Sequence, residues 1–346
     1  RGLPVTNLSW VTNTMFDVGI DFSLLNSKLS GQIDLFERKV TGVPAARYDV
    51  LVPSEVGYTL PKENLNSYGN FGIEGLLTYN GKVRDLNYTV SFSSTLARQK
   101  NLHTYKPRFG NSYDEYRNST ELRWSNITWG YHIIGQFQSQ EEIDNYPIDI
   151  DGKGNRSLLP GDLIYEDFNG DKIINSYDQK PIGYATGVNP YFNFGLNTLL
   201  EYKGFNFVMD FAGATMQTFI RNNELKIPYA GSNDGNSPVW LLTDRWHHAD
   251  PFDITSPWIP GTYPPTRKNL TSHSNFNKTN DFYLTNVRYF RNKNLEIGYT
   301  QPLRFLKNIS GSTIRIYTNI SNLFSIDNVG KKFQIDPEIS NSGGLA

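Results

Sequence analysis

The side chains best suited to chemistry lie between Asp167 and Asp178, where oxygen-bearing groups recur at alternate positions. The oxygen donors are Asp167, Asn169, Asp171, the backbone carbonyl of Ile173, Asn175 and Asp178. They follow the order 1, 3, 5, 7, 9 and 12 of a calcium-binding loop. Ca²⁺ requires several oxygen ligands converging at about 2.4 Å. The segment is therefore a candidate structural Ca²⁺ site.

Two residues of this segment depart from the calcium-loop pattern. Lys172 occupies the sixth position, where glycine is usual, and Asp178 occupies the twelfth, where glutamate is usual. The alternative is a turn rich in Asp and Asn whose side chains hydrogen-bond to their own backbone. Both interpretations remain open at this point.

A second group of candidates consists of aromatic residues outside the regularly alternating segments. These residues are Trp124, Trp129, Trp240, Trp246, Trp258 and Tyr263. Sugars and peptides bind aromatic faces that have a few polar neighbours, so these residues are candidate substrate-binding residues. The alternative is that the rings hold the loops together or contact a partner protein.

The sequence contains none of the common catalytic motifs. It has no G-x-S-x-G, H-E-x-x-H or P-loop pattern, and it has no cysteine. His247 and His248 are adjacent and invite interpretation as metal ligands, but adjacent side chains point apart in an extended chain, so a shared metal ion is not expected. We predict that the chain is not an enzyme. Loop carboxylates leave a glycosidase pair as an alternative, because spacing alone does not identify one.

Composition narrows the class of partner. The 346 residues include 33 Lys and Arg and 34 Asp and Glu, which give a formal net charge of −1. This balance does not favour nucleic acid. Aromatic residues make up 14% of the chain, an enrichment typical of strands and of membrane-interface girdles. No apolar run approaches the ~18 residues of a membrane helix.

The segment from Tyr191 to Gly213 has the pattern of the β-strands that connect these loops. Apolar residues alternate with Asn and Glu from Phe192 to Tyr202, and the alternation resumes at Phe205 after Lys203-Gly204. Alternation with a period of two on either side of a glycine turn predicts a β-hairpin. Each arm has about ten residues, enough for a tilted strand to cross a bilayer. One apolar and one polar face suit a wall between lipid and water.

The same pattern recurs along the chain, and roughly nine strands are expected. Further strands are predicted over 16–24, 29–40, 71–79, 86–96, 282–302 and 313–320. Long loops are predicted over approximately 41–67, 100–190 and 214–280, with one or two helical turns within 136–144. The expected fold class is all-β, with residues 1–346 forming part of a large antiparallel transmembrane β-barrel.

Several motifs occur in the order found in one transporter family. They include F-D-V-G-I-D-F-S-L-L-N-S-K-L-S-G-Q-I-D-L-F (16–36), N-S-Y-G-N-F-G-I-E-G (66–75), Y-H-I-I-G-Q-F-Q-S-Q-E-E-I (131–143), P-G-D-L-I-Y-E-D-F-N-G-D-K-I-I-N-S-Y-D (160–178), Y-K-G-F (202–205), D-R-W (244–246), R-N-K-N-L-E-I-G-Y-T-Q-P (291–302), R-I-Y-T-N-I-S-N-L-F (315–324) and D-P-E (336–338). With this set, the chain resembles the C-terminal part of a SusC/RagA-type TonB-dependent outer-membrane transporter.

The resemblance implies a barrel of about 22 strands in the bacterial outer membrane. An N-terminal plug domain and the last strand, both expected in the family, are absent from this sequence. It also implies three partners: a SusD-like surface lipoprotein lid, the TonB complex acting through the missing plug, and outer-membrane lipid. The implied activity is active import of oligosaccharides or oligopeptides, and the sequence does not decide between these substrates.

The alternative hypothesis is a soluble, secreted β-sandwich or propeller that binds glycans. In such a protein the apolar side chains of the strands pack into a closed core. Phe194, Phe207 and Val90 would then be enclosed between two sheets. In a barrel they would face lipid.

Overall fold

The computed structural model describes residues 8–47, 49–184, 186, 190–229, 237–267, 272–302 and 312–338. The chain divides into two compact units. Unit 1 comprises Arg1–Ser125, Pro190–Met216 and Val287–Asn328, and unit 2 comprises Asn126–Asn189, Gln217–Asn286 and Val329–Ala346. Among the described residues, no helix has the length and apolar character needed to cross a membrane.

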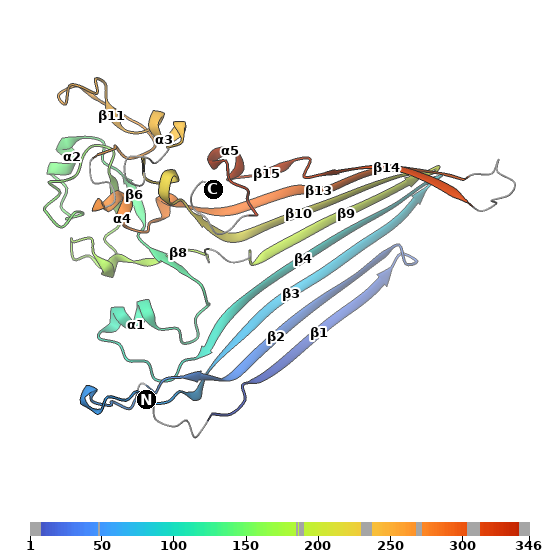
Figure 1. Cartoon of the computed structure of the whole chain (residues 1–346), viewed down its shortest axis with the longest axis horizontal. Helices are drawn as coiled ribbons and strands as arrows, with labels where there is room; N and C mark the ends of the chain where they lie inside the picture. The colour runs from blue at the N-terminus through green and yellow to red at the C-terminus, as the bar shows by residue number, and fades with distance from the viewer. Residues whose placement is uncertain are drawn as a thin grey trace. The chain divides into compact units, whose positions relative to one another are not determined.

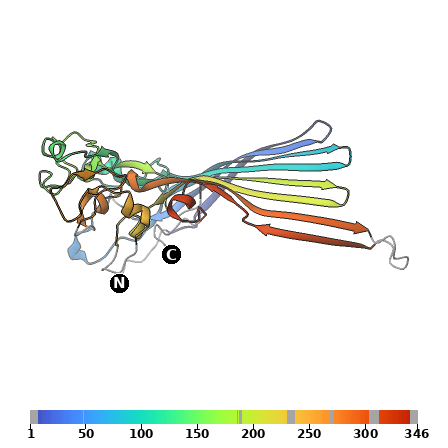
Figure 2. The ribbon, with the colours of Figure 1, turned by 90° about the horizontal axis from the view of Figure 1, so that it is seen from above.

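Unit 1 is built on a nine-stranded antiparallel sheet (Figures 1 and 2). The strand order is β1-β2-β3-β4-β9-β10-β13-β14, and β15 also pairs with β13. The strands are β1 (Thr12–Leu24), β2 (Leu29–Ala45), β3 (Glu63–Val83), β4 (Leu86–His103), β9 (Phe192–Tyr202), β10 (Phe205–Ile220), β13 (Leu284–Pro302), β14 (Thr313–Ser321) and β15 (Ser325–Asp327). Short helices η1 (Ser54–Val56) and α1 (Ser112–Asn118) lie in its connections.

The strands extend further than the alternating patterns predict. β2 ends at Ala45 and β3 begins at Glu63, so both enter the range expected as a loop over 41–67. β4 and β10 likewise extend into the ranges predicted as loops over 100–190 and 214–280. The reason is that backbone pairing continues after the side-chain alternation ends, as between Tyr68 and Asn101. The predicted hairpin turn at Lys203-Gly204 is confirmed, with Phe205 paired to Tyr202.

The register places apolar residues beside apolar residues on one face of the sheet. Leu77 of β3 pairs with Phe92 of β4, Phe92 pairs with Leu196 of β9, and Leu196 pairs with Phe211 of β10. Aromatic contacts continue along this face to β13, where the rings of Phe211 and Phe290 lie 5.0 Å apart. We call this the apolar face of the sheet.

The opposite face carries polar side chains that hydrogen-bond between strands. The Asn197 amide donates to Asp210 at 2.8 Å, and the Asn294 amide donates to the same carboxylate at 3.2 Å. The Asn206 amide donates to Glu296 at 3.0 Å, and Arg315 forms an ion pair with Glu296. We call this the polar face.

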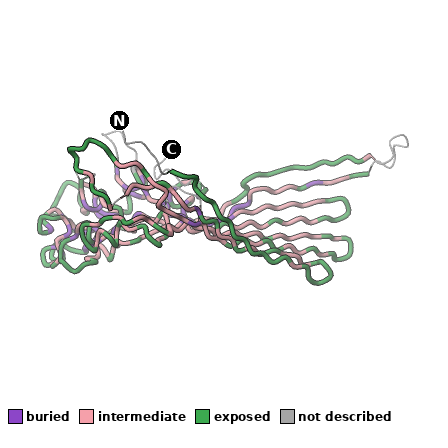
Figure 3. Tube along the Cα trace, turned by 90° about the horizontal axis from the view of Figure 1, so that it is seen from below, coloured by how far each residue is buried: buried purple, intermediate pink, exposed green. Residues whose placement is uncertain are grey.

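Large side chains of the apolar face remain exposed. Figure 3 shows that few residues along the strands of the sheet are buried. Leu77 is 43% exposed and Phe92 is 42% exposed, although both lie on strands with a neighbour on either side. Val90, Phe194 and Phe207 are partly exposed rather than buried. A β-sandwich would enclose these side chains. The fold is therefore not the one that the soluble alternative predicts.

Unit 2 consists of short elements around its own hydrophobic core. They are β5 (Thr128–Gly130), β6 (Ile133–Gln136), α2 (Gln140–Asp144), β7 (Leu163–Tyr165), η2 (Ser176–Asp178), β8 (Lys180–Gly183), η3 (Asn223–Leu225), α3 (Val239–Thr243), β11 (His247–His248), β12 (Trp258–Ile259), α4 (Ser274–Asn277), η5 (Asp281–Tyr283) and α5 (Gly330–Phe333). Helix α2 confirms the helical turns expected within 136–144, and Ser139 caps its N-terminus.

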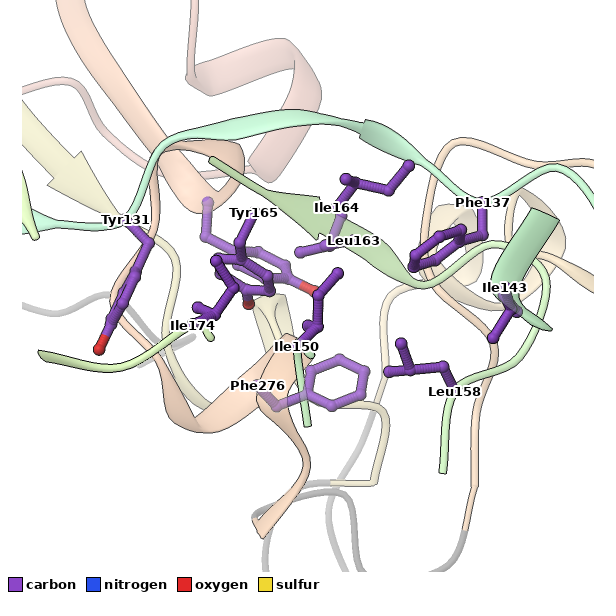
Figure 4. Packing of buried hydrophobic residues seen from close by; sticks show 11 residues of the cluster. Tyr131, Phe137, Ile143, Ile150, Leu158, Leu163, Ile164, Tyr165, Ile174 and Phe276 are labelled. Atoms are coloured by element: carbon purple, nitrogen blue, oxygen red, sulfur yellow. The ribbon is translucent and has the colours of Figure 1, made fainter. Parts of the chain in front are cut away.

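The core of unit 2 is formed by fully buried aromatic and aliphatic side chains (Figure 4). Phe137, Leu163 and Tyr165 have no exposed surface. The rings of Tyr131 and Tyr165 meet edge to face at 5.6 Å. Such packing makes unit 2 a folded body and not a set of independent loops, so it can hold side chains in fixed positions.

Candidate functional site

A cavity of about 570 Å³ in unit 2 brings two of the predicted aromatic residues together. We call it the aromatic pocket. It is lined by Leu242, Thr243, Arg245, Trp246, His247, His248, Ala249, Pro251, Trp258, Pro265 and Thr266. Cavities of this size that combine aromatic surface with a few polar groups are typical small-ligand sites.

The hairpin of β11 and β12 forms one wall of the aromatic pocket. His248 pairs with Trp258 across the hairpin, and their rings lie 4.0 Å apart at an interplanar angle of 36°. The turn is closed by local hydrogen bonds, including those of the Asp253 carboxylate with Thr255. The Thr255 hydroxyl and amide bonds lower the pKa of Asp253. The turn thus holds Trp258 against His248.

The hydrogen bonds of the two histidines indicate which ring nitrogen can accept. Nδ1 of His247 lies 2.8 Å from the carbonyl oxygen of His248, and Nδ1 of His248 lies 2.8 Å from that of Ser256. A carbonyl oxygen can only accept, so we assign the proton of each neutral ring to Nδ1. Each Nε2 then carries a lone pair.

Trp246 also lines this pocket and carries a donor without a partner among the described residues. It is 3% exposed, and its indole Nε1–H has no hydrogen-bond partner within the described residues. A buried polar group without a partner is costly unless a ligand or water completes it. The residues that line the aromatic pocket therefore combine ring faces with the unpartnered Trp246 donor and two ring nitrogens that can accept, a set that suits hydroxyl or amide groups.

The other predicted aromatic residues lie elsewhere. Trp240 packs against Tyr263 at 5.0 Å and Phe333 at 5.7 Å, within unit 2. Trp129 lies in β5, opposite Pro181 of β8. Trp124 lies in unit 1, where its ring contacts Phe71 at 6.3 Å and the Arg98 guanidinium lies 5.1 Å from it. The structure thus places Trp246 and Trp258 in the lining of one pocket. The Tyr263 carbonyl accepts from the backbone N–H of Trp246 at 2.9 Å and the Tyr263 ring packs against Trp240, whereas Trp124 and Trp129 lie elsewhere.

Sequence reasoning missed the histidines and prolines of the aromatic pocket. His247 and His248 drew attention only as possible metal ligands. Their adjacency in the sequence does not reveal that the hairpin stacks His248 on a tryptophan ten residues further on. The available signal was the proline- and aspartate-rich turn from Asp250 to Pro257, which is typical of a hairpin connection.

The segment from Asp167 to Asp178 forms a tight loop whose side chains bond to its own backbone. Asp167 accepts from the backbone N–H groups of Gly170 and Lys172, both at 2.8 Å. Asp178 is 1% exposed and accepts from Phe168 at 2.9 Å and from Asn175 at 2.8 Å. Burial is the largest influence on Asp178 and raises its pKa. These hydrogen bonds are those expected of a turn capped by its own Asp and Asn side chains, the alternative to a calcium site.

The backbone of this loop also has a feature of calcium loops. Lys172 has φ of 66°, the left-handed conformation that glycine supplies at the sixth position. Across the described residues, no group of three or more His, Asp or Glu side chains is gathered for a metal ion. A calcium ion here would need the Asn169 and Asn175 amides and the Ile173 carbonyl as well as carboxylates. The calcium site stays a prediction.

One buried lysine and one half-buried lysine of unit 2 give a pH-dependent stability. Burial lowers the pKa of Lys226 and of Lys278 to about 8. An unfolded lysine keeps its proton up to a pH of about 10.4. Between about pH 8 and pH 10 the unfolded state therefore binds more protons, and stability increases with pH. Below pH 8 both states are charged, and the cost of burying the charges is fully present.

Chemical denaturation followed by tryptophan fluorescence should show this increase from pH 8 to pH 10. Lys278→Met should make the increase in stability from pH 8 to pH 10 smaller, because it removes one of the two lysines with a lowered pKa. Lys172→Met, which alters an exposed lysine, should leave it unchanged. Stability that falls steadily across this range in the wild type would contradict the assignment.

The sequence of this chain is similar to those of known TonB-dependent receptors. The sequence is 25% identical over 325 residues to the TonB-dependent receptor P3 of Formosa agariphila, covering 92% of this chain and 30% of that protein. It is 22% identical over 344 residues to the TonB-dependent receptor SusC of Bacteroides thetaiotaomicron, covering 96% and 30%. The chain thus spans about a third of the length of these curated relatives. No protein-family model matches it.

The fold is similar to solved structures of the RagAB peptide importer. A chain of the open-open state matches with a TM-score of 0.66 at 18% identity, covering 96% of this chain and 33% of that one. The closed-closed state gives 0.63 at 19% identity, with the same coverage.

An antiparallel sheet with an exposed apolar face and a polar face is the construction of a transmembrane barrel wall. The fold class is a partial TonB-dependent transporter barrel. The resemblance to SusC/RagA-type TonB-dependent transporters, inferred from motifs, is confirmed by these relatives.

Proposed function

We propose that this chain is part of an outer-membrane transporter that imports oligosaccharides or oligopeptides and performs no covalent chemistry. The apolar face of the sheet carries the proposal, because exposed side chains such as Leu77 and Phe92 require lipid around them. The names of the relatives, which are receptors and importers, support it.

Two partners follow from this proposal. RagAB is an importer named for two components, which supports a SusD-like lipoprotein over the outer face of the barrel. The relatives named TonB-dependent support energy transfer from the TonB complex through a plug domain. Co-purification of an affinity-tagged chain from outer membranes tests the first partner, and loss of uptake in a strain lacking TonB tests the second.

The aromatic pocket is proposed as a substrate contact. Trp258→Ala should weaken ligand binding about tenfold, equivalent to about 1.4 kcal/mol, because the ligand loses the stacking face. Calorimetric titration with a panel of neutral oligosaccharides and defined oligopeptides measures the effect and identifies the substrate class.

Trp124→Ala is the matched control, since Trp124 packs within unit 1 against Phe71 and Arg98. Its affinity should equal that of the wild type. Trp258→Phe should retain most of the affinity because the ring face persists. Equal affinity in the wild type and Trp258→Ala would show that the aromatic pocket does not contact the substrate.

Calcium binding by the loop from Asp167 to Asp178 is tested separately. If the prediction is right, adding Ca²⁺ after chelation should raise the unfolding temperature of the wild type. Asp171→Asn should remove the increase, because it takes away the carboxylate at the fifth position. An unfolding temperature that does not respond to Ca²⁺ would show that the segment is a capped turn that does not bind calcium.

A further inference from the structure

A second cavity in unit 2, of about 470 Å³, has a different chemistry from the aromatic pocket. We call it the basic pocket. Its lining includes three cationic side chains, Lys153, Arg267 and Lys278, and one carboxylate, that of Asp151. Ser274 also lines this pocket.

Arg267 is held in a fixed orientation. Its Nη2 forms an ion pair with Asp162, which has no exposed surface. Its Nη1 donates to the carbonyl oxygen of Ser157 at 2.6 Å and lies 2.8 Å from Nε2 of His273. Its Nε–H is buried and has no hydrogen-bond partner among the described residues. The guanidinium is thus anchored, with one donor left over.

Lys278 and Ser274 provide further donors. The Lys278 ammonium group lies 3.3 Å from the carbonyl oxygen of Ile174 and 3.5 Å from that of Ile150, which use two of its three donors. Ser274 is 8% exposed, and its Oγ has no partner in the described part of the chain. The Ser274 carbonyl accepts from the hydroxyl of fully buried Tyr165 at 2.7 Å, which fixes the residue.

The carboxylates near these cations are already hydrogen-bonded. Asp151 accepts from the backbone N–H of Ser157 at 2.8 Å and from its hydroxyl at 2.6 Å. Asp149 and Asp178, which lie near Lys278, each accept from two backbone N–H groups. Asp162 accepts from Arg267 and from the Asn275 amide. These bonds occupy lone pairs of the carboxylates but leave their charges in place, and none of them reaches the Ser274 hydroxyl or the Arg267 Nε–H, which lack an acceptor among the described residues.

We propose that the basic pocket binds an oxoanion, a carboxylate or sulfate group, between Arg267, Lys278 and Ser274. Charge-assisted hydrogen bonds from ammonium and guanidinium groups to such anions are stronger than neutral ones. The oxoanion would satisfy the buried Ser274 hydroxyl and the Arg267 Nε–H, whose isolation is otherwise costly. Lys153, which is exposed at the rim, adds long-range attraction. The proposal does not depend on import.

Trifluoroacetate, a small carboxylate followed by fluorine NMR, tests the proposal on the purified protein. The fluorine signal should shift saturably with protein concentration. Acetate or sulfate should reverse the shift at constant ionic strength, and chloride should not. Displacement by acetate identifies a carboxylate site, displacement by sulfate a sulfate site, and displacement by both a general oxoanion site.

Variants localise the binding. Ser274→Ala and Lys153→Gln should each weaken trifluoroacetate binding at least threefold. Lys172→Gln changes the net charge by the same amount outside the pocket and should leave binding unchanged. Arg267→Lys keeps the charge but loses the Nε–H, so it should also weaken trifluoroacetate binding. Circular dichroism checks that this variant folds. The absence of a saturable shift in the wild type, or an equal loss in Lys172→Gln and Lys153→Gln, would overturn the proposal.

Discussion

Replacing Leu77 by lysine is expected to destabilise the protein in a bilayer by about 2–4 kcal/mol, the cost of a lysine on the lipid face near the midplane. Leu77 lies on the apolar face, paired with Phe92 of β4 and Gly31 of β2. Because the side chains of these two cross-strand partners offer no acceptor to the ammonium group, the lysine must remain in hydrocarbon or distort the bilayer. Equilibrium unfolding in phospholipid vesicles measures the loss.

Leu76→Lys is the matched control for this substitution. Leu76 is the same residue type, adjacent in the chain, and 39% exposed compared with 43% for Leu77. It lies on the polar face, between Ser93 and Gln32. In water-facing surroundings the added lysine should change stability by less than about 1 kcal/mol. Equal effects of the two lysines would show that the faces do not differ in environment.

Arg221→Ala is expected to destabilise unit 2 by about 3 kcal/mol, the second large effect. Arg221 is 5% exposed, and the Cζ of its guanidinium lies 5.0–5.6 Å from the ring centres of Tyr263, Phe282, Tyr283 and Phe333. Burial lowers its pKa. Alanine would remove these cation–π contacts and leave a cavity between the rings.

Arg221→Met separates the two contributions. Methionine fills a similar volume but carries no charge, so it should cost about half as much as alanine. Thermal unfolding followed by near-ultraviolet circular dichroism reports the packing of the surrounding rings. Replacing a buried charge by an apolar residue of similar volume is often neutral or stabilising. A methionine variant at least as stable as the wild type would therefore mean that the cation–π contacts do not offset the cost of burying the cation.

The strands of unit 1 could be predicted because each carries its own periodic signal. Side chains alternate between two faces, so the pattern from Phe192 to Phe211 defines β9, β10 and their turn without any long-range information. The strand ends could not be predicted in this way. From Glu63 to Asn70 the residues do not alternate, and only pairing with β2 and β4 keeps them extended.

The pockets of unit 2 could not be predicted from local pattern. Trp124, Trp240 and Trp258 all lie in segments predicted as long loops, yet of these three only Trp258 lines the aromatic pocket. Their positions depend on contacts between distant segments, such as that of Arg267 with Asp162. The loop from Asp167 to Asp178 is an intermediate case, because its internal hydrogen bonds follow from the sequence and a bound ion does not.

The central claim is that side chains of the sheet alternate between lipid and water, and a cysteine scan along β9 tests it most directly. The chain has no native cysteine, so single substitutions from Asn193 to Asn197 can each carry a fluorophore. Nitroxide groups on lipid chains should quench the label strongly at Phe194 and Leu196 and weakly at Asn193, Gly195 and Asn197. Uniform quenching along the strand, or the opposite alternation, would contradict the account.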